Sequence, residues 1–159
     1  ADAPTGTIVE TCPAASAIMR EIARRLAVQG GAALIIDYGH LSPRTGSTLQ
    51  AVRAHRKVDP LAHPGVADLT AHVDFAAIGR AAAEAGAAPH GPITQRDFML
   101  DLGALQRRDA LLARATPAQA TVIKTGVQRL IDPKEMGTLF KVMALTASGD
   151  AAADPPPGF

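Results

Sequence analysis

The residues best placed to do chemistry follow an apolar run in the first quarter of the chain. Ala32 to Ile36 is apolar throughout and is followed by Asp37, Tyr38, Gly39 and His40. Such a run without alternation is typical of a strand buried on both faces of a parallel sheet. Ligands bind at the carboxyl ends of such strands, so Asp37 could take a proton or hold a cation. The alternative is that Asp37 only closes a turn.

A second group of polar side chains follows in a segment rich in loop signals. Its members are three imidazoles, three carboxylates and a hydroxyl, from His55, Asp59, His63, Asp68, Thr70, His72 and Asp74. These residue types could supply a general base, a row of acceptors for a guanidinium, or metal ligands. Their spacing matches no zinc motif. We therefore expect either a wall that faces a substrate or a solvated structural loop, and Asp74 by itself is better explained as a helix cap.

Charge and glycine patterns exclude other classes of site. The chain has 16 Lys and Arg against 15 Asp and Glu, a net charge of +1, which is unlike the basic surface of a nucleic-acid-binding protein. The dinucleotide fingerprint G-x-G-x-x-G and the P-loop G-x-x-x-x-G-K do not occur in it. We expect neither nucleic acid nor a membrane as a partner, since the longest apolar run is far shorter than the roughly 20 residues of a spanning helix.

Cysteine usage and the first residues bear on location. Cys12 is the only cysteine, which excludes an internal disulfide and favours a reducing compartment, here the cytoplasm of a bacterium. The chain begins Ala1-Asp2-Ala3-Pro4, without an initiating Met or the basic and apolar regions of a signal peptide. We expect it to be an interior piece of a longer sequence.

The elements that position these residues alternate between strands and helices. The signals used are N-cap residues, proline in the first turn, glycine at helix ends and apolar periodicity. They predict strands at 7–10, 32–36, 90–94 and 139–146, an extended segment at 48–55, and helices at 13–29, 75–85, 98–112 with a break at Gly103, and 117–131. This order is typical of an α/β fold in which helices cover a sheet, with half of the sheet present.

The same residues carry a resemblance to a known family. The stretch from Gly30 to His40 is followed in order by shorter matching pieces: Thr48-Leu49, His55, Asp59-Pro60-Leu61, Pro64-Gly65, Ala67-Asp68-Leu69-Thr70, His72-Val73-Asp74-Phe75, Gly91-Pro92-Ile93, Met136-Gly137 and Phe140-Lys141. In this pattern the chain resembles the MidA-type S-adenosylmethionine-dependent methyltransferases, a family that includes the mitochondrial complex I assembly-factor methyltransferase. The resemblance covers positions 7 to 146.

The resemblance implies a fold and a cofactor. Residues 1–147 would be the C-terminal portion of a class I Rossmann-like methyltransferase fold, with three layers and a mostly parallel sheet whose last strand is antiparallel. Residues 148–159, with their three consecutive prolines, would be a disordered tail. The cofactor would be S-adenosylmethionine, but the family's glycine-rich loop and ribose-binding acidic residue have no counterpart here. No cofactor-binding residue can therefore be assigned, and we expect this piece alone to be inactive.

The resemblance also implies a reaction, the methylation of a protein arginine linked to assembly of respiratory complex I. The expected catalytic residues are Asp37, His72 and Asp68. Tyr38, Gly39, His40, His55, Thr70 and Asp74 would contact the substrate, and no metal ligand is assigned. Expected partners are the protein substrate and either the missing N-terminal half or a second copy along the open sheet edge; eukaryotic relatives would act in the mitochondrial matrix.

Two other functions stay open at this point. One is a non-catalytic assembly or interaction domain that has the fold without using the cofactor. The weaker one is a metal-dependent hydrolase built on the histidine and aspartate cluster.

Overall fold

The computed structural model describes residues 4–42, 44–62, 64–148 and 155–159. His63, a member of the polar cluster, lies outside the described residues. The elements in chain order are α1 (Pro13–Gln29), β1 (Ala32–His40), β2 (Gln50–Arg53), β3 (Arg56–Val58), β4 (Asp68–Thr70), β5 (Val73–Asp74), α2 (Phe75–Glu84), β6 (Ala87–Thr94), α3 (Gln95–Asp101), α4 (Ala104–Leu112), α5 (Pro117–Ile131), α6 (Met136–Leu139) and β7 (Phe140–Ala147).

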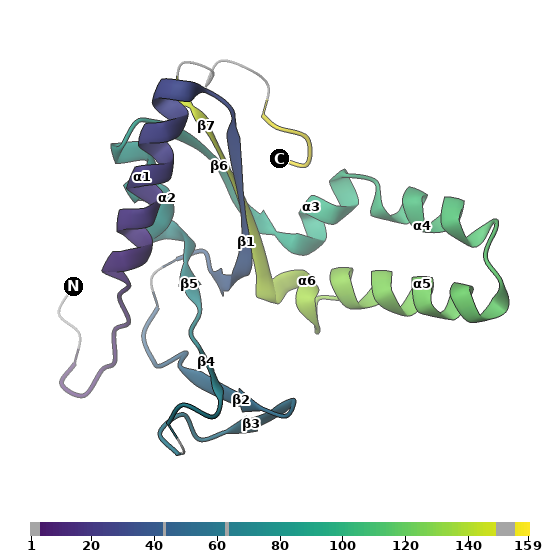
Figure 1. Ribbon diagram of the computed structural model, residues 1–159, viewed down its shortest axis with the longest axis horizontal. Coiled ribbons are helices and arrows are strands. Elements are labelled where there is room, and N and C mark those ends of the chain that lie inside the picture. Colours follow the sequence, from purple (N-terminus) through teal and green to yellow (C-terminus); the bar gives the residue numbers. More distant parts are fainter. Residues whose placement is uncertain (1–3, 43, 63, 149–154) are drawn as a thin grey trace.

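The main sheet has the strand order β5-β1-β7-β6 (Figure 1). β7 runs antiparallel to both of its neighbours, and β5 runs parallel to β1. Three strands therefore share one direction and β7 opposes them, as expected for a mostly parallel sheet with an antiparallel last strand. The β1–β7 ladder is continuous from Ala32 opposite Thr146 to Tyr38 opposite Phe140. Gly39 and His40 then pair on the other side with β5.

Helices α1 and α2 pack side by side on one face of this sheet and bury the main core (Figure 1). Pro13 begins α1 and the amide of Gly30 ends it by donating to the carbonyl of Leu26 at 2.8 Å. Asp74 caps α2 by accepting from the amide of Ala77 at 2.9 Å. Both helix predictions and the Asp74 cap are confirmed. The fully buried side chains of the core include Phe75, Met143 and Leu145.

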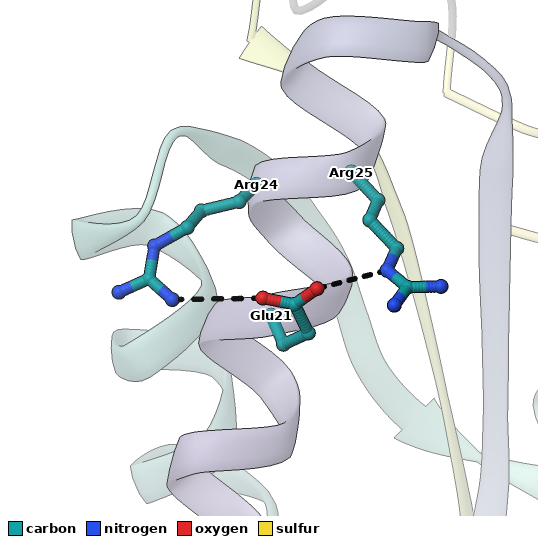
Figure 2. A network of polar contacts seen from close by, with 3 residues as sticks. All are labelled: Glu21, Arg24 and Arg25. Atoms are coloured by element: carbon teal, nitrogen blue, oxygen red, sulfur yellow. Dashed lines mark hydrogen bonds and ion pairs between the residues drawn. The ribbon is translucent and has the colours of Figure 1, made fainter.

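The outer surface of α1 is charged. Glu21 lies between Arg24 and Arg25 and pairs with both, at 3.7 and 2.9 Å (Figure 2). The two pairs are spaced three and four residues apart on the helix. Because all three side chains are more than half exposed to solvent, these ion pairs contribute little to stability.

The prediction that the strand at 32–36 is buried on both faces is wrong. Ala33 and Ile35 pack against the α1–α2 core, whereas Leu34 and Ile36 are 54% and 47% exposed on the opposite face. An unbroken apolar run says that both faces favour burial, and it does not say what covers the second one. Among the described residues, β5 pairs with β1 only at Gly39 and His40, which leaves the edge from Ala32 to Tyr38 open on that side.

The opposite face of the sheet is covered in part by α3 and the end of the chain. A cavity beside β1 is lined by Ala32, Leu34, Phe98 of α3, Ala144 and Phe159, among others. The rings of Phe98 and Phe159 lie 5.3 Å apart. That residues 148–159 form a disordered tail stays a prediction, since 149–154 are outside the described residues; residues 155–159 are described in contact with Phe98.

Residues 50–70 form a separate three-stranded antiparallel sheet in the order β3-β2-β4. The extended segment predicted at 48–55 is confirmed as β2 and the turn that follows it. The strand predicted at 7–10 is wrong, because these residues form no ladder and are joined to the loop at 46–49 by hydrogen bonds instead.

Helices α4 and α5 form an antiparallel pair that extends away from the sheet, and α3 and α6 connect this pair to the sheet (Figure 1). The predicted break at Gly103 is confirmed, and this residue has a φ of 82° that favours glycine. Thr116 and Gln119 form a capping box at the start of α5. The side chains of Gln95 and Arg96 donate to the carbonyls of Leu130 and Ile131, each at 2.8 Å, and so fix the end of α5 to α3.

Candidate functional site

The carboxyl end of β1 brings three rings together. Tyr38 packs edge-on against His72 at a centroid distance of 5.7 Å and against Phe140 at 5.5 Å. Tyr38 is the last residue of the β1–β7 ladder, opposite Phe140, and His72 immediately precedes β5. This end of a strand is where ligands bind in open α/β sheets, so we call Tyr38, His72 and Phe140 the ring cluster of the candidate site.

Gly39 lets two chain segments meet beside this cluster. A Cβ atom at Gly39 would lie 2.2 Å from the carbonyl oxygen of Val73 and 3.0 Å from the ring of Phe75. The structure therefore gives Gly39 a packing role. His40 lies opposite Asp74 in the β1–β5 pair, and its Nδ1 donates to the carbonyl of Ser42 at 2.7 Å.

Asp37 lies on the other face of β1 from Tyr38, because successive side chains of a strand alternate. Its Oδ1 accepts from the amide of Tyr38 at 2.8 Å. Asp37 lies within β1, opposite Lys141 of β7, so the interpretation that it only closes a turn is wrong. A role for Asp37 in the reaction stays a prediction.

The structure does not bring all the predicted residues to one place. Asp68 and Thr70 lie in β4, and His55 lies in the turn between β2 and β3, all within the small sheet rather than the main one. Asp74 is occupied as the cap of α2. The residues that the structure gathers at the end of β1 are thus Tyr38, Gly39, His40, His72 and Asp74.

Sequence reasoning missed two residues, Glu10 and Thr48, that connect to His72 through hydrogen bonds. The carboxylate of Glu10 accepts from the amide and the hydroxyl of Thr48, at 2.8 and 2.5 Å. The same hydroxyl oxygen accepts from the amide of His72 at 2.9 Å. Thr48 is one of the residues that carry the family resemblance, which is the only sequence signal that could have pointed to it.

The electrostatic environment favours a neutral imidazole at His72. Burial is the largest cause that lowers the pKa of His72, electrostatic interactions with Arg44, His40 and Lys141 lower it further, and the interaction with Glu10 raises it. Lys141 is itself buried, which lowers its pKa, and its Nζ donates to the carbonyls of Thr138 and Leu139. A neutral imidazole can accept a hydrogen bond or a proton.

The described residues offer little to a metal ion. In the part of the chain that the structure describes, no three His, Cys, Asp or Glu side chains are close enough to hold a metal ion. The cavity beside β1 has a mainly apolar lining of Ala, Leu, Pro and Phe residues with no acidic side chain to hold a ribose. The lining of this cavity therefore does not fit the ribose of S-adenosylmethionine.

Comparison with known proteins decides the family. Residues 1–93, more than half of the chain, match the family described as "Putative S-adenosyl-L-methionine-dependent methyltransferase". The chain belongs to this family. The predicted Rossmann-like methyltransferase fold agrees with this family. The relatives give no support to a metal-dependent hydrolase.

Two curated relatives of this methyltransferase-family chain carry the same name. A protein named "Protein arginine methyltransferase NDUFAF7, mitochondrial" from Xenopus tropicalis is 38% identical over 94% of this chain and 34% of its own length. The protein of the same name from Mus musculus is 41% identical over 86% of this chain and 31% of its own length. The chain thus spans about a third of the length of these relatives.

Solved structures give the same fold. A COG1565 superfamily protein from Burkholderia thailandensis superposes with a TM-score of 0.77 at 36% identity, over 93% of this chain and 40% of that one. A second superfamily member from the same organism, bound to S-adenosylhomocysteine, gives 0.71 at 34% identity over 92% and 40%. Within the described residues, no helix is long and apolar enough to cross a bilayer.

Proposed function

We propose that this chain forms the acceptor side of the active site in an S-adenosylmethionine-dependent protein arginine methyltransferase. The observation that carries the proposal is the ring cluster at the carboxyl end of β1. The name shared by the relatives supports a protein arginine as the acceptor. The solved relative bound to S-adenosylhomocysteine supports the cofactor, which residues other than those described would hold.

The ring cluster suits a guanidinium in two ways. The face of Tyr38 can stack on the planar cation, an interaction worth about 1 kcal/mol at an exposed site and more when water is excluded. The neutral imidazole of His72 can accept a hydrogen bond, or a proton, from a guanidinium nitrogen. Together the two rings would fix both the plane and the rotation of the arginine side chain.

The other predicted site residues lie outside the ring cluster and have supporting roles in this proposal. Asp37 and Asp68 remain candidates to orient the guanidinium, and Gly39, His40 and Asp74 would support the loop around it. Thr70 and His55 would contact the protein that carries the arginine, from the small sheet. The rates of methyl transfer by Asp37→Asn and by Asp68→Asn test separately whether each carboxylate orients the guanidinium.

The proposal also names the methylated protein and the compartment in which the enzyme acts. The family resemblance supports a subunit of respiratory complex I as the methylated protein. The relatives named as mitochondrial support the mitochondrion in eukaryotes, and in a bacterial host we propose the cytoplasm.

A second function is favoured by one observation. Leu34 and Ile36 present an exposed apolar face beside an open strand edge. A non-catalytic assembly or interaction domain would need these features and no cofactor.

Transfer of a labelled methyl group distinguishes the two functions. The complete gene product is incubated with methyl-labelled S-adenosylmethionine and an extract of cells that lack the gene. We expect label in a protein arginine, and Tyr38→Ala should lower the rate about tenfold or more, as expected for loss of a cation–π contact. Val28→Ala, on the exposed surface of α1, is the matched control. Absence of labelled arginine would favour the non-catalytic domain.

A further inference from the structure

Glu10 makes more hydrogen bonds to other segments than its place in an irregular stretch suggests. Its Oε1 accepts from the amide of Thr48 at 2.8 Å, the hydroxyl of Ser47 at 3.1 Å and the amide of Leu49 at 3.3 Å. Its Oε2 accepts from the hydroxyl of Thr48 at 2.5 Å. One carboxylate thus binds a loop that is 37 to 39 residues further along the chain.

These bonds favour the ionised carboxylate. The hydrogen bonds from Thr48 hold the pKa of Glu10 at about 2, well below its usual value of 4.5. Glu10 is therefore ionised in the neutral range, and hydrogen bonds to an ionised acceptor are about twice as strong as neutral ones.

Thr48 transmits this arrangement to His72. A carboxylate can only accept and a backbone amide can only donate, so the Thr48 hydroxyl donates to Glu10 and accepts from the amide of His72. His72 lies directly before β5, and its ring packs against Tyr38. A continuous path of contacts therefore runs from Glu10 through Thr48 and His72 to Tyr38.

We propose that Glu10 is a positioning residue for the acceptor site, acting through Thr48 to set the place of His72 against Tyr38. The part of this inference that concerns the acceptor rests on the proposed function, whereas the positioning of His72 does not. The amide of Gly46 also donates to the carbonyl of Ile8 at 3.0 Å, so loss of the Glu10 side chain leaves the two segments joined.

Amide hydrogen exchange and NMR test the positioning directly. Glu10→Gln should speed exchange at the His72 amide about tenfold and weaken the Tyr38–His72 ring contacts, because a neutral amide replaces the charged acceptor. Exchange in the α1–α2 core, for example at Ala23 and Ala82, should not change. Glu21→Gln makes the same chemical change on an exposed helix face and should leave the His72 amide unaffected (Figure 2).

Two substitutions at Thr48 separate positioning from general stability. Thr48→Val removes the hydroxyl and should reproduce the effect of Glu10→Gln on His72, whereas Thr48→Ser keeps the hydroxyl and should restore protection. Unchanged exchange at His72 in Glu10→Gln and Thr48→Val would overturn the proposal. Equal loss of protection at His72 and in the core would overturn it as well, since a merely structural role predicts that result.

Steady-state kinetics of the complete gene product extend the test to the acceptor. Glu10→Gln should raise KM for the protein substrate or lower kcat while KM for S-adenosylmethionine stays the same, with rescue in Thr48→Ser relative to Thr48→Val. If the unaltered protein transfers no methyl group, the proposed function fails while the exchange result still decides the role of Glu10. If kinetics are unaltered although exchange at His72 rises, Glu10 does not position the acceptor site.

Discussion

At the scale of single residues, the charge of Glu10 makes the stability of the folded protein depend on pH. Its pKa falls from 4.5 to about 2 in the folded protein, so the native state binds its proton less readily than the unfolded state. A depressed carboxyl pKa contributes stability that is fully present above about pH 4.5 and is lost as the pH falls toward 2.

We therefore expect Glu10→Gln to be less stable than the unaltered chain at pH 6 and the difference to shrink steadily between pH 4.5 and pH 2. Urea unfolding at a series of pH values measures this difference. Glu21→Gln serves as the control, with no comparable dependence expected from a solvated helix pair. A gap between Glu10→Gln and the unaltered chain that stays constant over this range would contradict the assignment.

The sequence predicted the residues at the end of β1 better than those that hold them. That Tyr38, Gly39 and His40 lie near the end of a strand was predictable because they follow an apolar run, and a strand end is a general position for ligands. Their contact with a substrate stays a prediction. Glu10 could not, because its partners lie in another segment without periodicity and the bond depends on how two irregular stretches meet. Side-chain hydrogen bonds over such separations leave no local pattern.

At the scale of elements, Gly39 sets how closely β1 and β5 can approach. Gly39→Ala would place a Cβ 2.2 Å from the carbonyl oxygen of Val73, and backbone atoms must move to relieve it. We expect a loss of about 3 kcal/mol or more in the free energy of unfolding.

Gly126 in α5 provides the matched control. A Cβ atom there would meet nothing within 4 Å. Gly126→Ala should stabilise the protein by about 0.5–1 kcal/mol, because alanine favours the helix. Denaturant unfolding of both variants checks the pair, and similar small effects would mean that β1 and β5 are not packed as described.

The turn between β2 and β3 has an unfavourable sequence for its geometry. Ala54 and His55 both have positive φ, 47° and 61°, in a two-residue hairpin turn of the kind that favours Asn-Gly. We expect Ala54→Asn with His55→Gly to stabilise the protein by about 1 kcal/mol or more, measured by thermal unfolding. If turnover falls while stability rises, His55 contacts the substrate; if neither changes, the turn geometry is wrong.

Helix and strand positions were largely predictable from the sequence, and burial was less so. Asp74, Thr116 and Gly103 mark helix boundaries through local hydrogen bonds and backbone preferences, which act within a few residues. The exposure of Leu34 and Ile36 and the contact between Phe98 and Phe159 depend on which distant segments meet, so composition alone could not supply them.

At the scale of the whole molecule, β1 presents both an open edge and an exposed apolar face. Unpaired strand edges and apolar patches of this kind favour association. We expect the 159-residue chain alone to pair with a second copy or with another polypeptide of its family, and to bind S-adenosylmethionine negligibly. Light scattering over a range of concentrations measures the association, and a monodisperse 16.4 kDa monomer would contradict it. Calorimetry measures the binding of S-adenosylmethionine.

The proposal that Tyr38 and His72 bind the acceptor arginine is tested most directly by a crystal structure of the complete gene product with S-adenosylhomocysteine and an arginine peptide from its methylated substrate. We expect the guanidinium to stack on Tyr38, with one of its nitrogens within hydrogen-bond distance of the His72 ring. A guanidinium bound away from β1, with Tyr38 and His72 untouched, would contradict it.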